Sequence, residues 1–166
     1  MDKDIFNDRD IQMMEEALKE ARHAFDQGEV PVGAILILNG KIIARAYNQM
    51  EGLKDPSAHA EVLAIRAGAR KLGDWRLLET TLYTTLEPCI MCAGALLLAR
   101  VDRIVWGAPD LRHGAHGSLL NVFETQHPTH TLQINGGLLE EKSATLMREF
   151  FKKQRRKDDT VARSPF

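Results

Sequence analysis

Cysteine is scarce in this sequence: two of the 166 residues, Cys89 and Cys92, are cysteines. This excludes a fold stabilised by several disulfide bonds, which needs about four or more cysteines. Two thiols in a C-x-x-C spacing, in a reducing compartment, more often bind a metal or perform redox chemistry. The pair is therefore a candidate site.

Long apolar runs and a large net charge are also missing. No stretch approaches the ~20 consecutive apolar residues of a membrane span. The acidic start Met1-Asp2-Lys3-Asp4 lacks the basic and then apolar pattern of a secretory signal. We therefore expect a cytoplasmic protein with no membrane role. The net charge of -1 excludes holding nucleic acid by bulk positive charge, so any such contact must come from a local patch.

The length and composition are those of one globular domain. Apolar residues make up 44% and charged residues 27%, which is near the average for soluble proteins. No internal repeat or linker divides the chain. We expect one domain over residues 1–157 and a flexible tail over residues 158–166.

Hydrophobic periodicity and turn residues predict alternating helices and strands. Asn39-Gly40 is the strongest hairpin signal, because both positions tolerate positive φ. The order favours an α/β fold in which helices cover both faces of a mixed sheet. The expected helices span residues 11–25, 58–72 and 88–100, a short piece from Ser118 and a final helix from Leu138; the expected strands span 32–38, 41–47, 81–86, 103–106 and 131–134.

Two short motifs, His59-Ala60-Glu61 and Pro88-Cys89-Ile90-Met91-Cys92, fall at predicted helix starts. Residues at i and i+3 share a helix face, so both thiols can bind one ion, and a helix N-terminus favours their thiolate form. With the imidazole of His59 they make a three-ligand zinc site with an open fourth position, which is the catalytic arrangement. Zinc lowers the pKa of bound water toward ~7. Glu61 is the candidate that takes the proton and returns it to a departing amine.

Each motif alone has a simpler explanation. A C-x-x-C is more often half of a structural zinc site or a redox pair, and an isolated H-x-E is close to noise. Their combination, with Pro88 before the first cysteine, matches the signature of zinc-dependent base deaminases.

The sequence resembles the bacterial tRNA-specific adenosine deaminases of the cytidine and deoxycytidylate deaminase superfamily. The resemblance covers nearly the whole chain. The matching stretches are Glu29-Val30-Pro31-Val32-Gly33-Ala34, Asn48, Ala58-His59-Ala60-Glu61, Thr85-Leu86-Glu87-Pro88-Cys89-Ile90-Met91-Cys92-Ala93-Gly94-Ala95, Asp110, Gly117-Ser118-Leu119-Leu120-Asn121, and Phe150-Phe151 with the basic segment that follows.

This resemblance implies a three-layer α/β/α cytidine-deaminase-like fold with a central mixed five-stranded sheet, and a homodimer. It implies conversion of the wobble adenosine, position 34 of a tRNA anticodon, to inosine by attack of activated water at C6 with release of ammonia. It gives one zinc per subunit to His59, Cys89 and Cys92, and proton transfer to Glu61.

The resemblance also assigns substrate contacts. Asn48 matches a residue that hydrogen-bonds the nucleoside, although an Asn after a strand can simply cap a turn. Asp110 matches an acid near the target ribose, where a carboxylate can accept from a 2′-OH; otherwise it is a solvated loop residue. Val30 and Ala60 match the lining of the base pocket, although small apolar residues are ordinarily core.

Lys152, Lys153, Arg155 and Arg156 form a basic run that is either a solvated helix end or a set of RNA backbone contacts; we favour RNA. Thr129 stands where the family pattern has an Asn that contacts the anticodon.

His113 and His116 are expected to be loop residues rather than ligands of a second metal, because no carboxylate or thiol accompanies them. They are also candidates to face RNA.

Two other functions share these motifs. A deaminase of free nucleobases, nucleosides or nucleotides, of guanine or cytosine type, would use the same zinc ligands. A catalytically silent zinc protein that binds RNA or a partner subunit would keep the ligands, but it would have no use for an acid such as Glu61.

Overall fold

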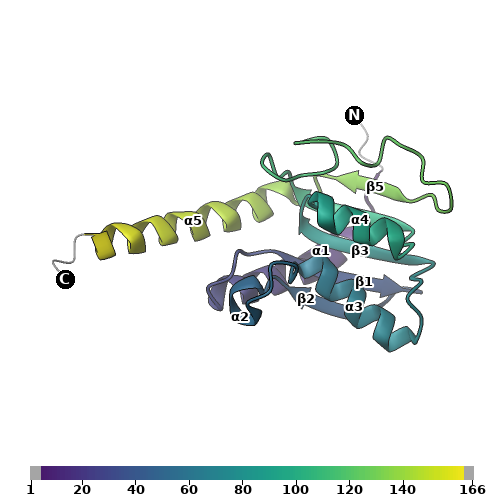
Figure 1. Ribbon diagram of the computed structural model, residues 1–166, viewed down its shortest axis with the longest axis horizontal. Helices are drawn as coiled ribbons and strands as arrows, with labels where there is room; N and C mark the ends of the chain where they lie inside the picture. Colours follow the sequence, from purple (N-terminus) through teal and green to yellow (C-terminus); the bar gives the residue numbers. More distant parts are fainter. Residues whose placement is uncertain (1–4, 163–166) are drawn as a thin grey trace.

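A five-stranded sheet with helices on both faces forms the body of the protein (Figure 1). The computed structural model describes residues 5–162, with side chains over residues 5–158. The expected α/β/α architecture is confirmed. The elements are α1 (Asp8–Asp26), β1 (Gly33–Leu38), β2 (Lys41–Tyr47), α2 (Met50–Leu53), α3 (Ala60–Leu72), β3 (Thr80–Leu86), α4 (Ile90–Leu98), β4 (Arg103–Ala108), β5 (Gln133–Gly136) and α5 (Glu140–Ala162).

The strands lie in the order β2-β1-β3-β4-β5. Strand β1 pairs antiparallel with both β2 and β3, whereas β3, β4 and β5 run parallel to one another. The sheet is therefore mixed, as expected. The parallel strands β3 and β4 end at the same edge, so the segments that follow them meet there.

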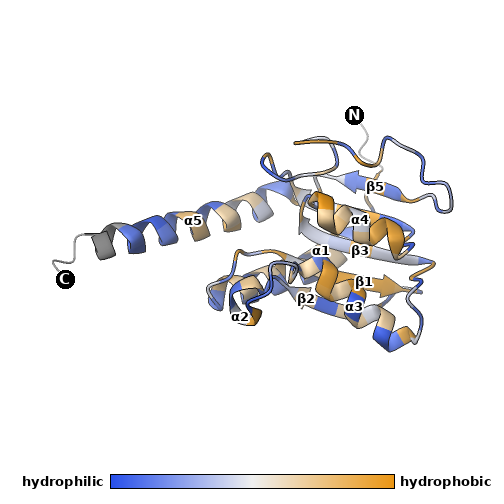
Figure 2. Ribbon diagram, viewed as in Figure 1, coloured by the Kyte–Doolittle hydropathy of each residue, from blue (hydrophilic) through white to orange (hydrophobic). Residues whose placement is uncertain are grey.

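Alternating side chains of β1 build the two halves of the core. Ala34 and Leu36 pack in the cluster that includes residues of α3 and α4, whereas Ile35 and Ile37 pack in the cluster that includes residues of α1. This is the period of two expected of a strand buried on both faces. Figure 2 shows β1 and much of α4 as strongly hydrophobic, whereas the outer part of α5 is hydrophilic.

Three local features shape the N-terminal half of the chain. Asn7 caps α1 in a capping box with Asp10, which satisfies backbone N–H groups at the start of the helix. Gly33 allows α1 to approach β1, because a Cβ at Gly33 would lie 2.1 Å from the carbonyl oxygen of Ala17. Asn39 and Gly40 have positive φ, as their hairpin turn requires.

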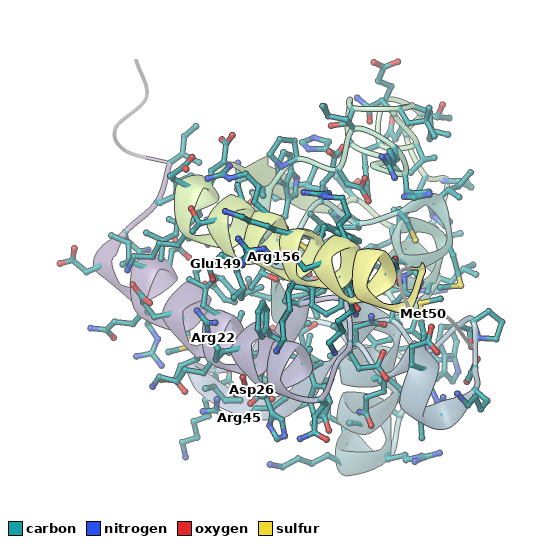
Figure 3. The ribbon with its side chains drawn as sticks, turned by 90° about the vertical axis from the view of Figure 1, so that its left-hand side faces the viewer. Arg22, Asp26, Arg45, Met50, Glu149 and Arg156 are labelled. Carbon is teal, nitrogen blue, oxygen red and sulfur yellow. The ribbon has the colours of Figure 1, made fainter. Side chains whose placement is uncertain are left out.

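Helix α5 first packs against the sheet beside α1 and then projects beyond the body (Figure 1). The Nη1 atom of Arg22 in α1 lies 3.9 Å from the Oε2 atom of Glu149 in α5, where the two helices are adjacent (Figure 3). Residues 158–162 of the segment expected as a flexible tail continue this helix. Residues 163–166 of that segment lie outside the described residues.

The expected helix from Ser118 was wrong. Residues 118–123 form turns and a bend, with Asn121 in an isolated β-bridge to His116, and the side chain of Asn121 accepts a hydrogen bond from the backbone N–H of Phe123. Such a bond between a side chain and the backbone competes with helix formation. The sequence interpretation also missed α2 and placed β5 two residues early. Over residues 5–162, no helix has the length and apolar content to cross a bilayer.

Candidate metal centre

The starts of α3 and α4 bring the candidate metal ligands together. His59 is the N-cap residue of α3, and Cys89 is the N-cap residue of α4, which follows β3 after a short connection. Cys92 lies one turn into α4 and is fully buried. The two helices pack side by side on one face of the sheet, so their N-termini open at the same edge.

The ligand atoms of these residues have the spacing of a zinc site. The Nδ1 atom of His59 lies 3.6 Å from the Sγ atom of Cys89 and 3.4 Å from the Sγ atom of Cys92. Zn–S bonds of ~2.3 Å and Zn–N bonds of ~2.0 Å at a tetrahedral angle place sulfur and nitrogen about 3.5 Å apart. Among the described residues, this is the one group of His, Cys, Asp and Glu side chains close enough to share an ion. The donor set therefore fits zinc, as the sequence predicted.

The electrostatics of the three ligands also suit a cation. Hydrogen bonding from Cys92 and from His59 lowers the pKa of Cys89 to about 4, although burial opposes this. The pKa of Cys92 is raised, first by its hydrogen bond to Cys89 and then by burial. Hydrogen bonding to Cys89 raises the pKa of His59. The site thus holds a thiolate and exchangeable protons that a divalent metal replaces on binding.

Glu61 lies in the first turn of α3, two residues after His59, and its side chain is 4% exposed. Burial raises its pKa to about 7, although His59 acts in the opposite direction. A carboxyl group with a pKa near neutrality can both accept and return a proton, which is the property a general acid–base group needs. Its location beside the ligand set agrees with the role expected from the sequence.

Asn48 follows β2 and is buried close to the ligand set. Its Nδ2 atom donates to the carbonyl oxygen of Val30 at 3.3 Å, and the next residue, Gln49, donates to the carbonyl oxygen of Ala58 at 3.0 Å. Its Oδ1 atom is buried and has no hydrogen-bond partner among the described residues. A buried acceptor without a donor costs free energy, so a ligand that donates to it is stabilised. Ala60, beside His59, is fully buried, and Val30 is half-buried.

Asp110 lies in the loop after β4, near enough to His59 to contribute to its raised pKa. Its Oδ1 atom accepts from the backbone N–H groups of Arg112 and His113, and its Oδ2 atom lies 3.4 Å from the Nδ1 atom of His113. The carboxylate therefore orders its own loop.

Glu87 is a residue to which the sequence interpretation gave no role. It directly precedes Pro88, it is almost fully buried, and it accepts hydrogen bonds from the loop that follows β4. The sequence did contain a signal for Glu87, which is an acidic residue between a buried strand and the metal-binding helix. A charge buried at such a position needs hydrogen-bond partners.

The two loop histidines lie in different surroundings. The Nδ1 atom of His116 accepts from the indole N–H of Trp106 at 3.0 Å, and its ring packs edge-on against Phe123. His113 is exposed beside Asp110. Neither belongs to a group of possible metal ligands in the described part of the chain. The sequence interpretation expected no carboxylate near these histidines, but the Oδ2 atom of Asp110 lies 3.4 Å from the Nδ1 atom of His113.

The basic run lies on the outer part of α5. Lys152, Lys153, Arg155 and Arg156 are all exposed, and the Nζ atom of Lys153 lies 5.2 Å from the ring centre of Phe25. The run is thus presented on the part of α5 that leaves the body (Figure 1).

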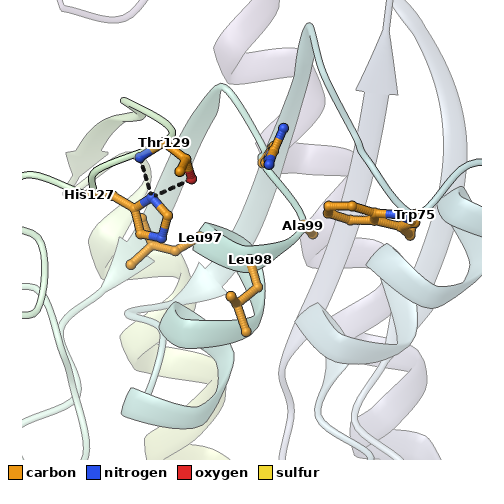
Figure 4. Close-up of a pocket in the computed structure, with 7 residues that line it drawn as sticks. Trp75, Leu97, Leu98, Ala99, His127 and Thr129 are labelled. Atoms are coloured by element: carbon orange, nitrogen blue, oxygen red, sulfur yellow. Dashed lines mark hydrogen bonds between the residues drawn. The ribbon is translucent and has the colours of Figure 1, made fainter.

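A shallow depression of about 360 Å³ lies at the other end of α4 from the ligand set (Figure 4). Its lining includes Trp75, Leu98 and Thr129. The backbone N–H of Thr129 donates to the Nδ1 atom of His127 at 3.2 Å, as Figure 4 shows. None of the metal ligands lines this depression, so it is separate from the candidate metal centre.

Comparisons with known proteins agree with this geometry. The family described as the cytidine and deoxycytidylate deaminase zinc-binding region matches residues 7–108. The tRNA-specific adenosine deaminase of Bacillus subtilis is 46% identical over 144 residues, which cover 87% of this chain and 89% of that protein. The chloroplastic tRNA(adenine(34)) deaminase of Arabidopsis thaliana is 49% identical over 83% of this chain, but the match spans 12% of that longer protein.

A solved structure shows the same arrangement of the chain. It comes from work on A-to-I editing by tRNA:A34 deaminases at the wobble position of transfer RNA. The two structures superpose with a TM-score of 0.76 at 43% sequence identity, over 81% of this chain and 98% of the other.

Proposed function

Because this chain belongs to the cytidine and deoxycytidylate deaminase family, we propose that it is a zinc-dependent hydrolase that converts adenosine 34 of a tRNA anticodon to inosine. The observation that carries the choice of substrate is the similarity, over most of both chains, to proteins named tRNA-specific adenosine deaminase. The zinc ligands alone indicate deamination of some base, since the whole family shares them.

His59, Cys89 and Cys92 hold one zinc ion per subunit in this proposal. Zinc at such a site is a Lewis acid that lowers the pKa of water toward ~7. Two thiolates balance the charge of the ion, so the site stays nearly neutral in the buried edge of the sheet.

Glu61 moves the protons of the reaction. It takes a proton from the attacking water and delivers it to N1 of the adenine. It then takes the second proton from the hydroxyl group formed at C6 and delivers it to the departing amine. A C6–O bond forms, the C6–N6 bond breaks, and ammonia leaves. The raised pKa of Glu61 supports this role, because one group must act as both base and acid.

Asn48, Asp110, Val30 and Ala60 bind the nucleoside. The buried Oδ1 atom of Asn48 offers an acceptor to the substrate, and its amide is already fixed by Val30. Asp110 offers a carboxylate to the ribose 2′-OH, which favours RNA over DNA. Ala60 and Val30 leave room for the base because their side chains are small.

The basic run on α5 contacts the phosphates of the anticodon stem-loop. Lys152, Lys153, Arg155 and Arg156 are exposed on one projecting helix, so a nearly neutral protein gains a local positive patch. Phosphate contacts orient the RNA, while the base pocket selects the nucleotide.

The enzyme works as a homodimer through the outer face of α4. Ile90 is 58% exposed and Leu98 is 69% exposed, and Met91 lies beside them on the same short helix. Exposed apolar side chains gathered on one helix indicate an association surface. A cytoplasmic location agrees with the two free thiols that the metal requires.

The test is the inosine content of anticodon stem-loop RNA after incubation with the zinc-loaded protein. Free adenosine, guanine and cytidine serve as parallel substrates. We expect inosine at position 34 and little reaction of the free compounds. Deamination of only a free base or nucleoside would establish the alternative function, and no turnover with zinc bound would indicate a binding protein.

A further inference from the structure

Glu87 is a buried acidic side chain that the proposed deamination chemistry does not use. It directly follows the last residue of β3, and its backbone N–H donates to the carbonyl oxygen of Ala108 at 2.8 Å, which continues the pairing with β4. Its side chain is 1% exposed. An acid buried to this extent needs several hydrogen-bond donors to remain in place.

One loop, residues 109–118, supplies four hydrogen bonds to the carboxylate of Glu87. The Oε1 atom accepts from the backbone N–H groups of His116 at 2.9 Å and Ser118 at 3.2 Å. The Oε2 atom accepts from the backbone N–H of Asp110 at 3.0 Å and from the hydroxyl of Ser118. Burial alone would raise the pKa of Glu87, but these hydrogen bonds outweigh it and lower the pKa. The carboxylate is therefore the acceptor on which both ends of the loop converge.

The loop also packs closely against the carboxylate and against the metal-binding turn. A Cβ at Gly114 would lie 2.3 Å from the carboxyl carbon of Glu87, so only glycine fits there without displacement. The backbone N–H of Ala115 donates to the carbonyl oxygen of Pro88 at 2.9 Å, and Gly114 forms a β-bridge with Cys89. The loop that carries Asp110 is thus fixed directly to Pro88 and to Cys89, one of the proposed zinc ligands.

We propose that Glu87 is a positioning residue for substrate binding, which holds the 109–118 loop so that Asp110 faces the ribose of the target nucleotide. This inference rests on the proposed function, because Asp110 acts on an RNA ribose. In this proposal Glu87 contacts neither the substrate nor the side chains that bind the metal. It acts through Asp110.

The test compares Glu87→Gln, Asp110→Ala and the double variant, each loaded with zinc. Glutamine retains one acceptor oxygen but places an NH₂ group against donors, so part of the loop is released. We expect Glu87→Gln and Asp110→Ala each to raise KM for stem-loop RNA about tenfold, the effect of losing one good hydrogen bond. The value of kcat should change by less than about twofold, because Glu61 and the zinc ligands are untouched.

The double variant separates positioning from general damage. If Glu87 acts through Asp110, the double variant should show about the same tenfold rise as either single variant. A rise of about a hundredfold would mean independent effects and would overturn the proposal. Loss of zinc from Glu87→Gln would also overturn it, because the residue would then support the metal site.

Amide hydrogen exchange gives a second readout that does not need activity. The amides of Asp110, His116 and Ser118 should exchange faster in Glu87→Gln. Unchanged exchange together with unchanged KM would refute the proposal. Gly114→Ala is a second variant for the case in which Glu87→Gln folds poorly. Its methyl group would displace the loop from the carboxylate of Glu87, so it should also raise KM and speed up exchange of the three amides.

Asp10→Asn is the matched control. Asp10 is equally buried and is bonded to Tyr83 and Arg103 on the opposite face of the sheet. This variant should lower thermal stability and leave KM unchanged. If the wild-type enzyme deaminates no RNA, the proposed function fails, and the role of Glu87 in holding the loop is then decided by the exchange of the three amides.

Discussion

At the scale of single residues, Glu61 is almost fully buried, and its pKa is raised, whereas the pKa of the similarly buried Glu87 is lowered by its hydrogen bonds. The same burial that excludes water raises the pKa of Glu61 to about 7. Zinc binding requires His59, Cys89 and Cys92, whereas proton transfer requires Glu61. The two functions can therefore be separated by mutation.

Glu61→Gln should keep zinc and lose turnover. The amide has nearly the same shape as the carboxyl group, but it cannot take up and release a proton at neutral pH. We expect kcat to fall by at least about 100-fold, the usual contribution of a general acid–base group. Atomic absorption should find one zinc per chain in both proteins. Turnover within about tenfold of wild type would contradict the assigned role.

At the scale of elements, α3 and α4 form the site and α5 extends its reach. The N-termini of α3 and α4 meet at one edge of the sheet, because each follows the previous strand or turn through a short connection. The outer part of α5 makes no comparable packing contacts with the sheet and carries exposed cations. Its position suits an RNA that extends beyond the target base.

Replacing Lys152, Lys153, Arg155 and Arg156 by Gln should weaken binding of stem-loop RNA. We expect KM to rise about tenfold at moderate salt, with a smaller change in kcat. The dependence of log KM on log salt should become flatter by ~0.7 to 0.9 for each phosphate contact that is lost.

The control for this experiment replaces Arg70 and Lys71, two exposed cations at the end of α3 that is distant from His59. Their loss should leave the salt slope unchanged. Equal salt slopes for wild type and the α5 variant would assign the basic run to a solvated helix end.

At the scale of the whole molecule, buried polar groups join elements that are far apart in the sequence. Asp10 of α1 accepts from Tyr83 of β3 at 2.6 Å and from Arg103 of β4 at 2.7 Å. Burial raises the pKa of Asp10, but its hydrogen bonds with Arg103, Tyr83 and Asn7 outweigh this and lower it below 3.8. One carboxylate therefore joins α1 to two strands of the sheet.

Asp10→Asn should destabilise the fold in a pH-dependent way. Because the pKa of Asp10 is lower in the folded state, its contribution is complete above the unfolded pKa of 3.8 and is lost as the pH falls below that value. We expect a loss of about 3 kcal/mol in the free energy of unfolding at pH 7. The difference between wild type and variant, measured by urea unfolding, should shrink below pH 4. A difference that stays constant from pH 7 to pH 3 would contradict this account.

The proposed dimer is tested at the same scale. Leu98→Glu places a charge on the exposed apolar face of α4 and should convert a dimer into a monomer in sedimentation equilibrium. Ile11→Glu introduces the same charge at an exposed position of α1, across the sheet, and should leave the dimer intact. A wild-type protein that sediments as a monomer would refute the proposed assembly.

Much of this molecule follows from local sequence. Helix α1 shows its period in Met14 and Ala21, which are both buried, and the hairpin is marked by Asn39 and Gly40, because these signals are local in the sequence. The two cysteine ligands were predicted for the same reason. A spacing of three residues fixes Cys89 and Cys92 on one face of a helix in any fold that forms it.

The tertiary structure decided what depends on contacts between distant residues. The conformation of the loop after β4 has no local sequence pattern, because Glu87, more than twenty residues earlier, accepts hydrogen bonds from its backbone N–H groups. The unpartnered oxygen of Asn48 and the raised pKa of Glu61 arise from burial, which no short segment encodes. The sequence by itself determined most of the helices and strands and the cysteine pair of the zinc site, because their signals are local. His59 lies 30 residues before Cys89 and reaches it only in the folded chain. Only the folded chain decided how the loops are held around those ligands, because those hydrogen bonds form between segments that only packing brings together.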